Sequence, residues 1–208
     1  MATAVSIRKA SAADSSAIAA LHLAQIPWGL LSSMGPRFVE TFYRTMLDSP
    51  SGFAFIAERE GRPVGYCTAI VHWRRFYRTF VLRNWALAAR IVFKRITGGG
   101  LRRLFETSRY AAAGTLPEAE LLSIALNPEA RGTGAADALV RAVLEEFSQR
   151  GVERVRVTTA GDNAAAAGVY ERSGFTLLHR TEIHQGESAS VYVIALGNRL
   201  PAGSRVPS

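Results

Sequence analysis

Apolar and polar positions alternate along the chain with two different periods, and the period predicts the element. Over residues 36–47 apolar side chains return every three or four positions, which predicts an amphipathic helix. Residues 52–58 and 64–71 are strand-like runs joined by a segment of turn composition. The same patterns predict helices over residues 14–24, 134–149 and 163–173, and strands over residues 5–10, 121–126, 152–159, 175–183 and 189–196.

These elements predict one α/β domain with a mixed sheet over residues 1–196. The tail, residues 197–208, is rich in Gly, Pro and Ser, so we expect it to be disordered. The single cysteine, Cys67, is expected in the core and permits no internal disulfide. With no signal peptide and no long apolar run, we expect a cytoplasmic protein. The four histidines occur singly, so no metal site is expected.

The most informative segment is residues 121–136, an apolar strand followed by Asn127-Pro128 and a glycine-rich turn that opens a helix. A helix start offers unpaired backbone N–H groups and a positive dipole end, which together favour a phosphate. Gly132 and Gly134 let the backbone approach a bulky anion, and Arg131 supplies a guanidinium. The P-loop pattern is missing, and Asp137 replaces the third glycine of the dinucleotide fingerprint.

A second segment, residues 162–175, begins with a helix N-cap candidate, continues as an alanine-rich helix and stops at a glycine. Its signature positions are Asn163, Ala166, Tyr170, Glu171, Gly174 and Phe175. Together with the Arg-x-x-Gly-x-Ala turn at residue 131, this segment closely resembles the GCN5-related N-acetyltransferases (GNAT). The resemblance implies a GNAT fold: a central mixed, mostly antiparallel sheet flanked by helices.

The resemblance also implies acetyl-CoA as cosubstrate. The turn amides would bind its pyrophosphate, the strand before the turn would pair with the pantetheine arm, and the Leu126 contact would polarise the thioester carbonyl. Asn163 would reach the arm. The implied cofactor residues are Ile124, Ala125, Leu126, Arg131, Gly132, Thr133, Gly134, Ala135, Ala136 and Asn163.

In such an enzyme an amine attacks the thioester directly, without a covalent enzyme intermediate. Tyr170 is the candidate general acid for the leaving thiolate, and Glu120 is the candidate general base. Strand alternation places Glu120, Leu122, Ile124 and Leu126 on one face unless a bulge intervenes. Glu118 and a water relay stay open as alternative bases.

By position in the family, the acceptor pocket is expected at residues 27–31, with Trp28, Gly29 and Leu30 as candidates, and Glu118 beside it. The acceptor amine stays open between a small molecule, an amino sugar and a peptide. Whether the donor carries an acetyl group or a longer acyl group also stays open. The alternative function is a non-catalytic acyl-CoA sensor or interaction module.

Residues 72–110 form an insert between the third and fourth strands. The insert carries ten basic residues and one acidic residue, a net charge of +9, whereas the whole chain carries +8. An aromatic stripe at roughly helical spacing predicts a helix here, broken near residue 98. Three interpretations stay open: a helical lid or homodimer surface, a helix on an anionic membrane surface, and a docking face for a polyanion, with nucleic acid not favoured.

Overall fold

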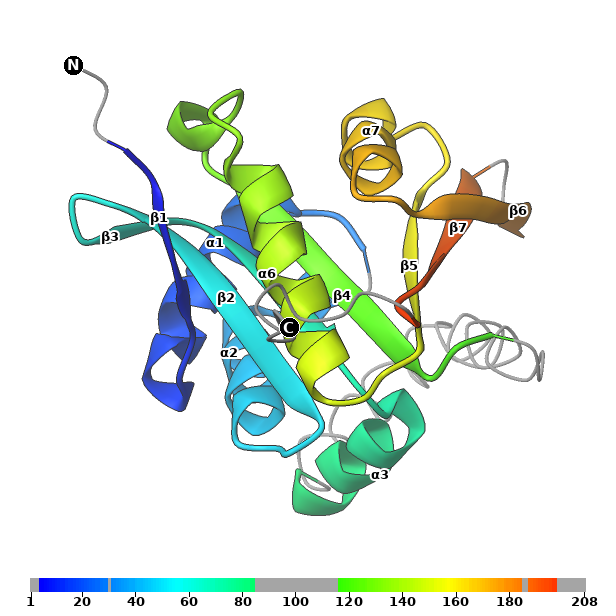
Figure 1. Ribbon diagram of the computed structural model, residues 1–208. Coiled ribbons are helices and arrows are strands. Elements are labelled where there is room, and N and C mark those ends of the chain that lie inside the picture. The colour runs from blue at the N-terminus through cyan, green and yellow to red at the C-terminus, as the bar shows by residue number, and fades with distance from the viewer. Residues whose placement is uncertain (1–3, 30, 85–115, 185–186, 198–208) are drawn as a thin grey trace, which may run out of the picture.

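The computed structural model describes residues 4–29, 31–84, 116–184 and 187–197, and in these residues it contains one seven-stranded sheet (Figure 1). The strand order is β1-β2-β3-β4-β5-β7-β6. Only the β4–β5 pair is parallel, so the expected mixed, mostly antiparallel sheet is confirmed. The strands are β1 (Ser6–Lys9), β2 (Gly52–Arg59), β3 (Arg62–Ile70), β4 (Ala119–Leu126), β5 (Arg154–Ala160), β6 (Thr176–His184) and β7 (Glu187–Ala195).

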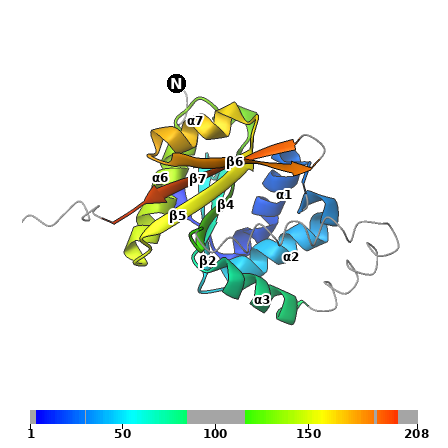
Figure 2. The ribbon, with the colours of Figure 1, turned by 90° about the vertical axis from the view of Figure 1, so that its right-hand side faces the viewer.

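Helices cover both faces of the sheet (Figure 2). One face carries α1 (Ser15–Gln25), α2 (Pro36–Leu47) and α3 (Trp73–Arg83), and the other carries α6 (Ala135–Gln149) and α7 (Ala164–Arg172). Strand β3 has a continuous buried run because both of its faces are covered: Cys67 packs in the α6 core, and Tyr66 packs in the α1–α2 core. In the described residues, none of these helices is long and apolar enough to cross a membrane.

Strands β4 and β5 pair only at the start of β4 and then diverge (Figure 1). The pairing joins Ala119–Leu121 to Val155–Val157, although β4 continues to Leu126. On its other side β4 has a bulge, because Thr68 faces Ser123 while Ala69 faces Leu121. A bulge bends a strand and raises its twist, which explains why β4 leaves β5 at this point.

The insert begins with α3, which packs against α2 through aromatic rings. Phe76 lies 5.4 Å from Phe42, and Phe80 lies 5.5 Å from Phe38, between ring centroids. Part of the predicted aromatic stripe is therefore core rather than surface. The rest of the predicted insert beyond Asn84, Leu30 of the predicted acceptor segment, and the tail beyond Gly197 lie outside the described residues.

Candidate functional site

The glycine-rich turn lies where β4 passes into α6, as the sequence predicts. Gly132 has φ 72° and Gly134 has φ 82°, in the left-handed region that glycine adopts without strain. In the described part of the chain, the backbone N–H groups of residues 132–136 donate no hydrogen bond to another backbone group. A Cβ built on either glycine would meet no atom within 4 Å. The turn therefore presents consecutive free donors to open space at a helix N-terminus, the geometry that binds a phosphate.

Arg131 is held at the rim of this turn by the end of α1. Its Nη2 donates to Gln25 Oε1 at 2.8 Å, and Gln25 Nε2 donates to Asn127 Oδ1 at 3.2 Å. Thr133 Oγ1 donates to the carbonyl oxygen of Ala130 at 2.7 Å, closing the turn from inside. These bonds orient the guanidinium beside the free amides before any ligand arrives.

The bulge changes the alternation that the sequence predicts along β4. Leu121, Ile124 and Leu126 pack toward the α6 core, whereas Leu122 and Ala125 pack toward the α1–α2 core. The extra residue at the bulge shifts the side-chain alternation by one position, so Leu122 does not share a face with Ile124 and Leu126. The single face expected from residue 120 to residue 126 required that no bulge intervene, and this bulge divides it. Beyond Leu121, β4 has no described strand partner on its β5 side, where an extended ligand can pair with its backbone.

Helices α6 and α7 both begin at the end of the sheet where β4 and β5 terminate, on either side of the opening between these strands (Figure 1). Asn163 caps α7: its Oδ1 accepts from the Ala166 N–H at 3.1 Å, which leaves the side-chain amide as a donor. The two helices are joined by an ion pair between Arg172 and Asp137 at 3.0 Å. The two motifs recognised in the sequence therefore face each other across the opening between β4 and β5.

Tyr170 is buried, with only 3% of its surface exposed. Its ring packs 5.8 Å from Phe175 and 6.1 Å from Tyr192, and among the described residues its hydroxyl has no hydrogen-bond partner. Burial, with a smaller contribution from Cys67, raises the pKa of Tyr170 above its usual value. The phenol is therefore protonated at neutral pH, as a proton donor must be.

Glu120 forms an ion pair across the short paired region of β4 and β5. Its Oε2 lies 2.7 Å from Arg156 Nη2, and both side chains are largely buried. The Arg156 guanidinium also lies 5.5 Å from the ring centroid of Trp73, the first residue of α3. The insert thus contributes directly to the surroundings of the predicted base.

A buried polar network lies on the face of the sheet that α1 and α2 cover, and it was not predicted from the sequence. The Nδ1 atom of His22 lies 2.7 Å from the Tyr43 hydroxyl and 2.9 Å from the Tyr66 hydroxyl. The Tyr43 hydroxyl also lies 3.1 Å from Ser123 Oγ, which lies 2.8 Å from Thr68 Oγ1. The network therefore joins α1 and α2 to the bulged part of β4. Its members are far apart in sequence, and no local pattern groups them.

Burial sets the charge state of this network. It lowers the pKa of His22 to about 4 and raises the pKa of Tyr43 to about 12. Burial also raises the pKa of Tyr66 well above its usual value. The imidazole and both phenols are therefore neutral near pH 7, which suits hydrogen bonding through the interior.

The predicted acceptor residues that the structure describes form no hydrogen bond or ion pair with one another. Trp28 is 67% exposed, and no described ring contact or hydrogen bond joins it to Glu118 or Glu120. Glu118 is half exposed, and its Oε2 lies 3.2 Å from His72 Nδ1 at the start of α3. In the described residues, no cluster of three or more His, Cys, Asp or Glu side chains could hold a metal ion.

Comparison with known proteins gives a consistent result. Residues 20–175 match the model of the acetyltransferase (GNAT) family. A 62-residue segment is 40% identical to a mycothiol acetyltransferase from Saccharomonospora viridis, covering 30% of this chain and 20% of the relative. A mycothiol acetyltransferase from Corynebacterium urealyticum is 35% identical over 68 residues, or 33% of this chain and 20% of the relative. The matched segment thus spans about a fifth of each relative's length.

Solved structures share the fold across nearly the whole chain. A putative GNAT acetyltransferase from Desulfovibrio desulfuricans superimposes with a TM-score of 0.61 at 14% identity, covering 93% of this chain and 99% of the other. The ribosomal-protein-S18-alanine N-acetyltransferase of Escherichia coli gives a TM-score of 0.59 at 17% identity, covering 94% and 98%. At these identities the likeness concerns the fold alone.

Proposed function

Because the chain belongs to the acetyltransferase (GNAT) family, we propose that it transfers an acetyl group from acetyl-CoA directly to a primary amine of an acceptor. The observation that carries this proposal is the turn at residues 131–136, whose free amides and oriented arginine fit a pyrophosphate. The unpaired edge of β4 beyond Leu121 fits the extended pantetheine arm. The amide of Asn163, on the opposite side of the opening, is the donor for a carbonyl of that arm.

In the proposed reaction the amine nitrogen attacks the thioester carbon, and the carbon–sulfur bond breaks. The backbone of β4 near Leu126 polarises the thioester carbonyl, and Tyr170 protonates the departing thiolate. We assign the base to Glu120 because its carboxylate lies on the strand that would carry the thioester and is held in place by Arg156. Glu118 is a weaker candidate because it is half exposed and paired with His72 at the start of α3.

A relay through water stays compatible with the same site. Ser123 Oγ, on the bulged part of β4, contacts the Tyr43 hydroxyl of α2, and together they can pass a hydrogen bond from a water molecule toward the interior. Because burial lowers the pKa of His22 to about 4, that imidazole is a poor final proton acceptor. The proton would therefore leave to solvent, and the hydroxyls would orient the water.

The acceptor is proposed as an amine-bearing small molecule, amino sugar or peptide. The similar proteins include a mycothiol acetyltransferase, by sequence, and a ribosomal-protein-S18-alanine N-acetyltransferase, by fold, and these two names indicate different acceptors. The matches to mycothiol acetyltransferases span only about a fifth of those relatives, so they assign no particular acceptor to this chain.

Isothermal titration calorimetry with acetyl-CoA tests the cofactor site first. Gly134→Trp should abolish binding, and Arg131→Ala should weaken it about tenfold, as expected for one charged hydrogen bond of about 1.5 kcal/mol. Gly151→Trp is the matched control: Gly151 also has positive φ and open space, but it follows the other end of α6. Equal loss in both tryptophan variants would indicate damage to the fold and contradict the assignment of the turn.

Thiol release from acetyl-CoA, measured against a panel of primary amines, then tests catalysis. Amine-dependent release supports the transferase. Tight acetyl-CoA binding without release for any amine in the panel would favour the sensor function instead.

A further inference from the structure

Helix α3 has two opposite faces. Phe76 and Phe80 are almost fully buried against α2. The opposite face projects into solvent, with Val81 50% exposed and Leu82 68% exposed. Because successive residues of a helix are rotated by about 100°, the arginines at positions 74, 75 and 78 share this outer face with Val81 and Leu82.

Two of the arginines of this face have no described side-chain partner. Arg75 and Arg78 form no hydrogen bond or ion pair through their side chains with any other described residue. They line an open groove of about 630 Å³ together with Leu82 and Glu118. Glu118, the one carboxylate among the described lining residues, is paired with His72.

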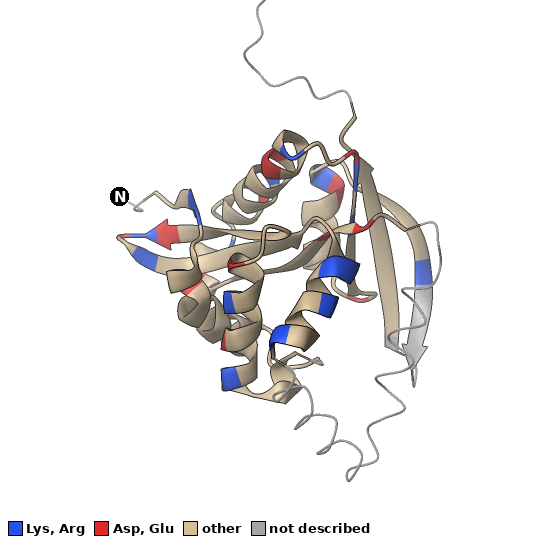
Figure 3. Ribbon diagram, turned by 90° about the horizontal axis from the view of Figure 1, so that it is seen from below, with Lys and Arg blue, Asp and Glu red and all other residues tan. Residues whose placement is uncertain are grey.

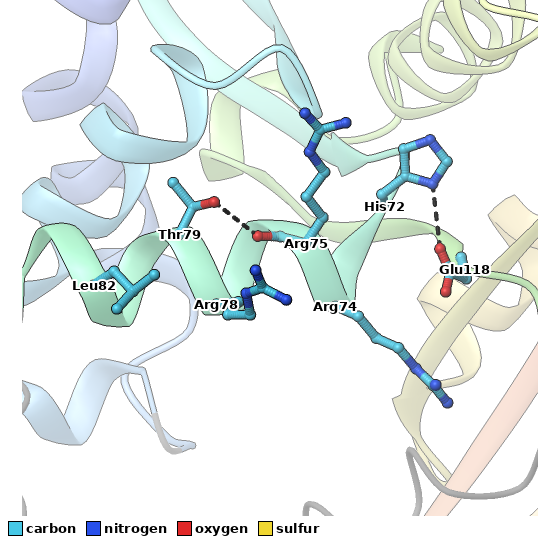
Figure 4. Close-up of a pocket in the computed structure, with 7 residues that line it drawn as sticks. All are labelled: His72, Arg74, Arg75, Arg78, Thr79, Leu82 and Glu118. Atoms are coloured by element: carbon cyan, nitrogen blue, oxygen red, sulfur yellow. Dashed lines mark hydrogen bonds and ion pairs between the residues drawn. The ribbon is translucent and has the colours of Figure 1, made fainter.

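Figure 4 shows that the three arginine side chains fan outward along the helix instead of converging on one point. A single small anion is best held by donors that converge on it. Side chains that diverge along a helix can instead contact several anionic groups spread over a surface.

The neighbouring helix extends the basic surface. Helix α2 packs beside α3, and its Arg37 is exposed and has no described side-chain partner. Figure 3, which views the molecule from this side, shows basic residues on both helices. The charge is concentrated in this part of the chain, since residues 72–110 carry +9 of sequence charge and the remainder carries −1.

We propose that the outer face of α3 binds an anionic membrane surface. Arginines on the polar side of a short amphipathic helix attract anionic headgroups, while aliphatic side chains between them enter the boundary with the acyl chains. The exposed Val81 and Leu82 favour a bilayer over nucleic acid, because aliphatic groups gain little beside phosphates alone. This proposal does not depend on the proposed acetyl transfer.

Co-sedimentation of the full chain with vesicles tests the proposal. The vesicles contain either phosphatidylcholine alone or phosphatidylcholine mixed with phosphatidylglycerol. We expect binding to the anionic vesicles only, weakened by salt. Arg75→Glu/Arg78→Glu should reduce this binding by about thirtyfold or more, since each basic residue near the surface contributes roughly fivefold. Leu82→Asp should also reduce it, by about tenfold, because it removes buried apolar surface.

The matched control is Arg62→Glu/Arg180→Glu, which makes the same charge change at exposed positions on β3 and β6, away from α3. It should keep most of the binding. A far-ultraviolet circular dichroism melt of each variant shows that it is folded. Equal sedimentation with both vesicle types, or equal loss in the control, would overturn the proposal. Binding that Leu82→Asp leaves unchanged and that duplex DNA competes for would also overturn it, in favour of a general polyanion surface.

Discussion

The imidazole of His22 lies in the interior between two tyrosine hydroxyls, with 4% of the residue exposed. An unperturbed histidine has a pKa near 6.5, and burial lowers that of His22 to about 4. Protonation is therefore disfavoured in the folded state and permitted in the unfolded state. The residue connects α1 to α2 through a hydrogen bond between neutral groups. Protonation of the imidazole at low pH would disrupt this bond.

The sign of the resulting pH dependence follows from linkage. Between pH 6.5 and about 4 the unfolded chain binds a proton that the folded chain does not, so the free energy of unfolding falls as pH falls. We expect a loss of up to about 3 kcal/mol over this window. Urea unfolding of wild type and His22→Gln at several pH values measures it. The variant should be less stable at pH 7 but should lose less stability on acidification, and parallel pH profiles would contradict the account.

Glu120 and Arg156 form a largely buried pair, so the role of Glu120 must be separated from its contribution to folding. If Glu120 is the base, Glu120→Gln should lower kcat by about a hundredfold or more while leaving the Kd of acetyl-CoA unchanged. Glu118→Gln should change kcat by less than about threefold. Steady-state kinetics across pH make the comparison.

The informative control is Arg156→Gln, which breaks the same ion pair but retains the carboxylate. If it lowers kcat as much as Glu120→Gln and the rate keeps its pH profile, Glu120 acts by positioning rather than as a base. A larger effect from Glu118→Gln would transfer the assignment to that residue.

At the scale of elements, the bulge in β4 decides how the site is built. It reverses the side-chain alternation after Leu121 and coincides with the end of pairing to β5. One irregularity thus sends Ser123 toward the Tyr43 network and leaves the backbone edge of β4 free on the other side. The candidate cofactor site and the polar network therefore meet at the same few residues.

Helix α3 offers a direct test of which part of the insert is structural. Phe80→Ala should lower the free energy of unfolding by about 3–5 kcal/mol, because Phe80 is 4% exposed and packs against Phe38. Leu82→Ala, two residues further along the same helix, should cost less than about 0.5 kcal/mol because Leu82 is 68% exposed. Chemical denaturation measures both, and similar losses would mean that the described packing of α3 is incorrect.

At the scale of the whole molecule, the candidate cofactor site lies between elements that contact each other through few bonds. The turn before α6 and the start of α7 lie on opposite sides of the opening, and one ion pair, Asp137–Arg172, joins the two helices among the described residues. A ligand that touches both sides would add contacts across the opening. Acetyl-CoA should therefore stabilise the fold as a whole.

Thermal unfolding in the presence of acetyl-CoA checks this expectation. At a concentration one hundred times its Kd, a ligand that binds only the folded state adds about 2.7 kcal/mol. For a domain of this size the Tm should rise by roughly 5–10 °C. Gly134→Trp should show no rise, whereas Gly151→Trp should keep it. A rise in both variants would place the ligand somewhere other than the turn.

Much of this molecule could be predicted from local sequence. The period of apolar residues predicted the described helices and strands within a few positions, since burial of one face imposes that period on each element. The free amides at Gly132 and Gly134 were also predictable, because a glycine-rich turn opening a helix has few other conformations. These features depend on residues that are neighbours in the chain.

The rest was decided by tertiary structure, because it depends on residues distant in sequence. His22, Tyr43, Tyr66 and Ser123 come from four elements, and only packing brings their polar atoms together. The bulge in β4 exists only in its pairing with β3, so strand alternation alone gave the wrong face beyond Leu121. Likewise, the apolar residues of α3 recur at helical spacing in the sequence, which does not say which of them are buried. Contact with α2 places Phe76 and Phe80 in the core, whereas Val81 and Leu82 face solvent.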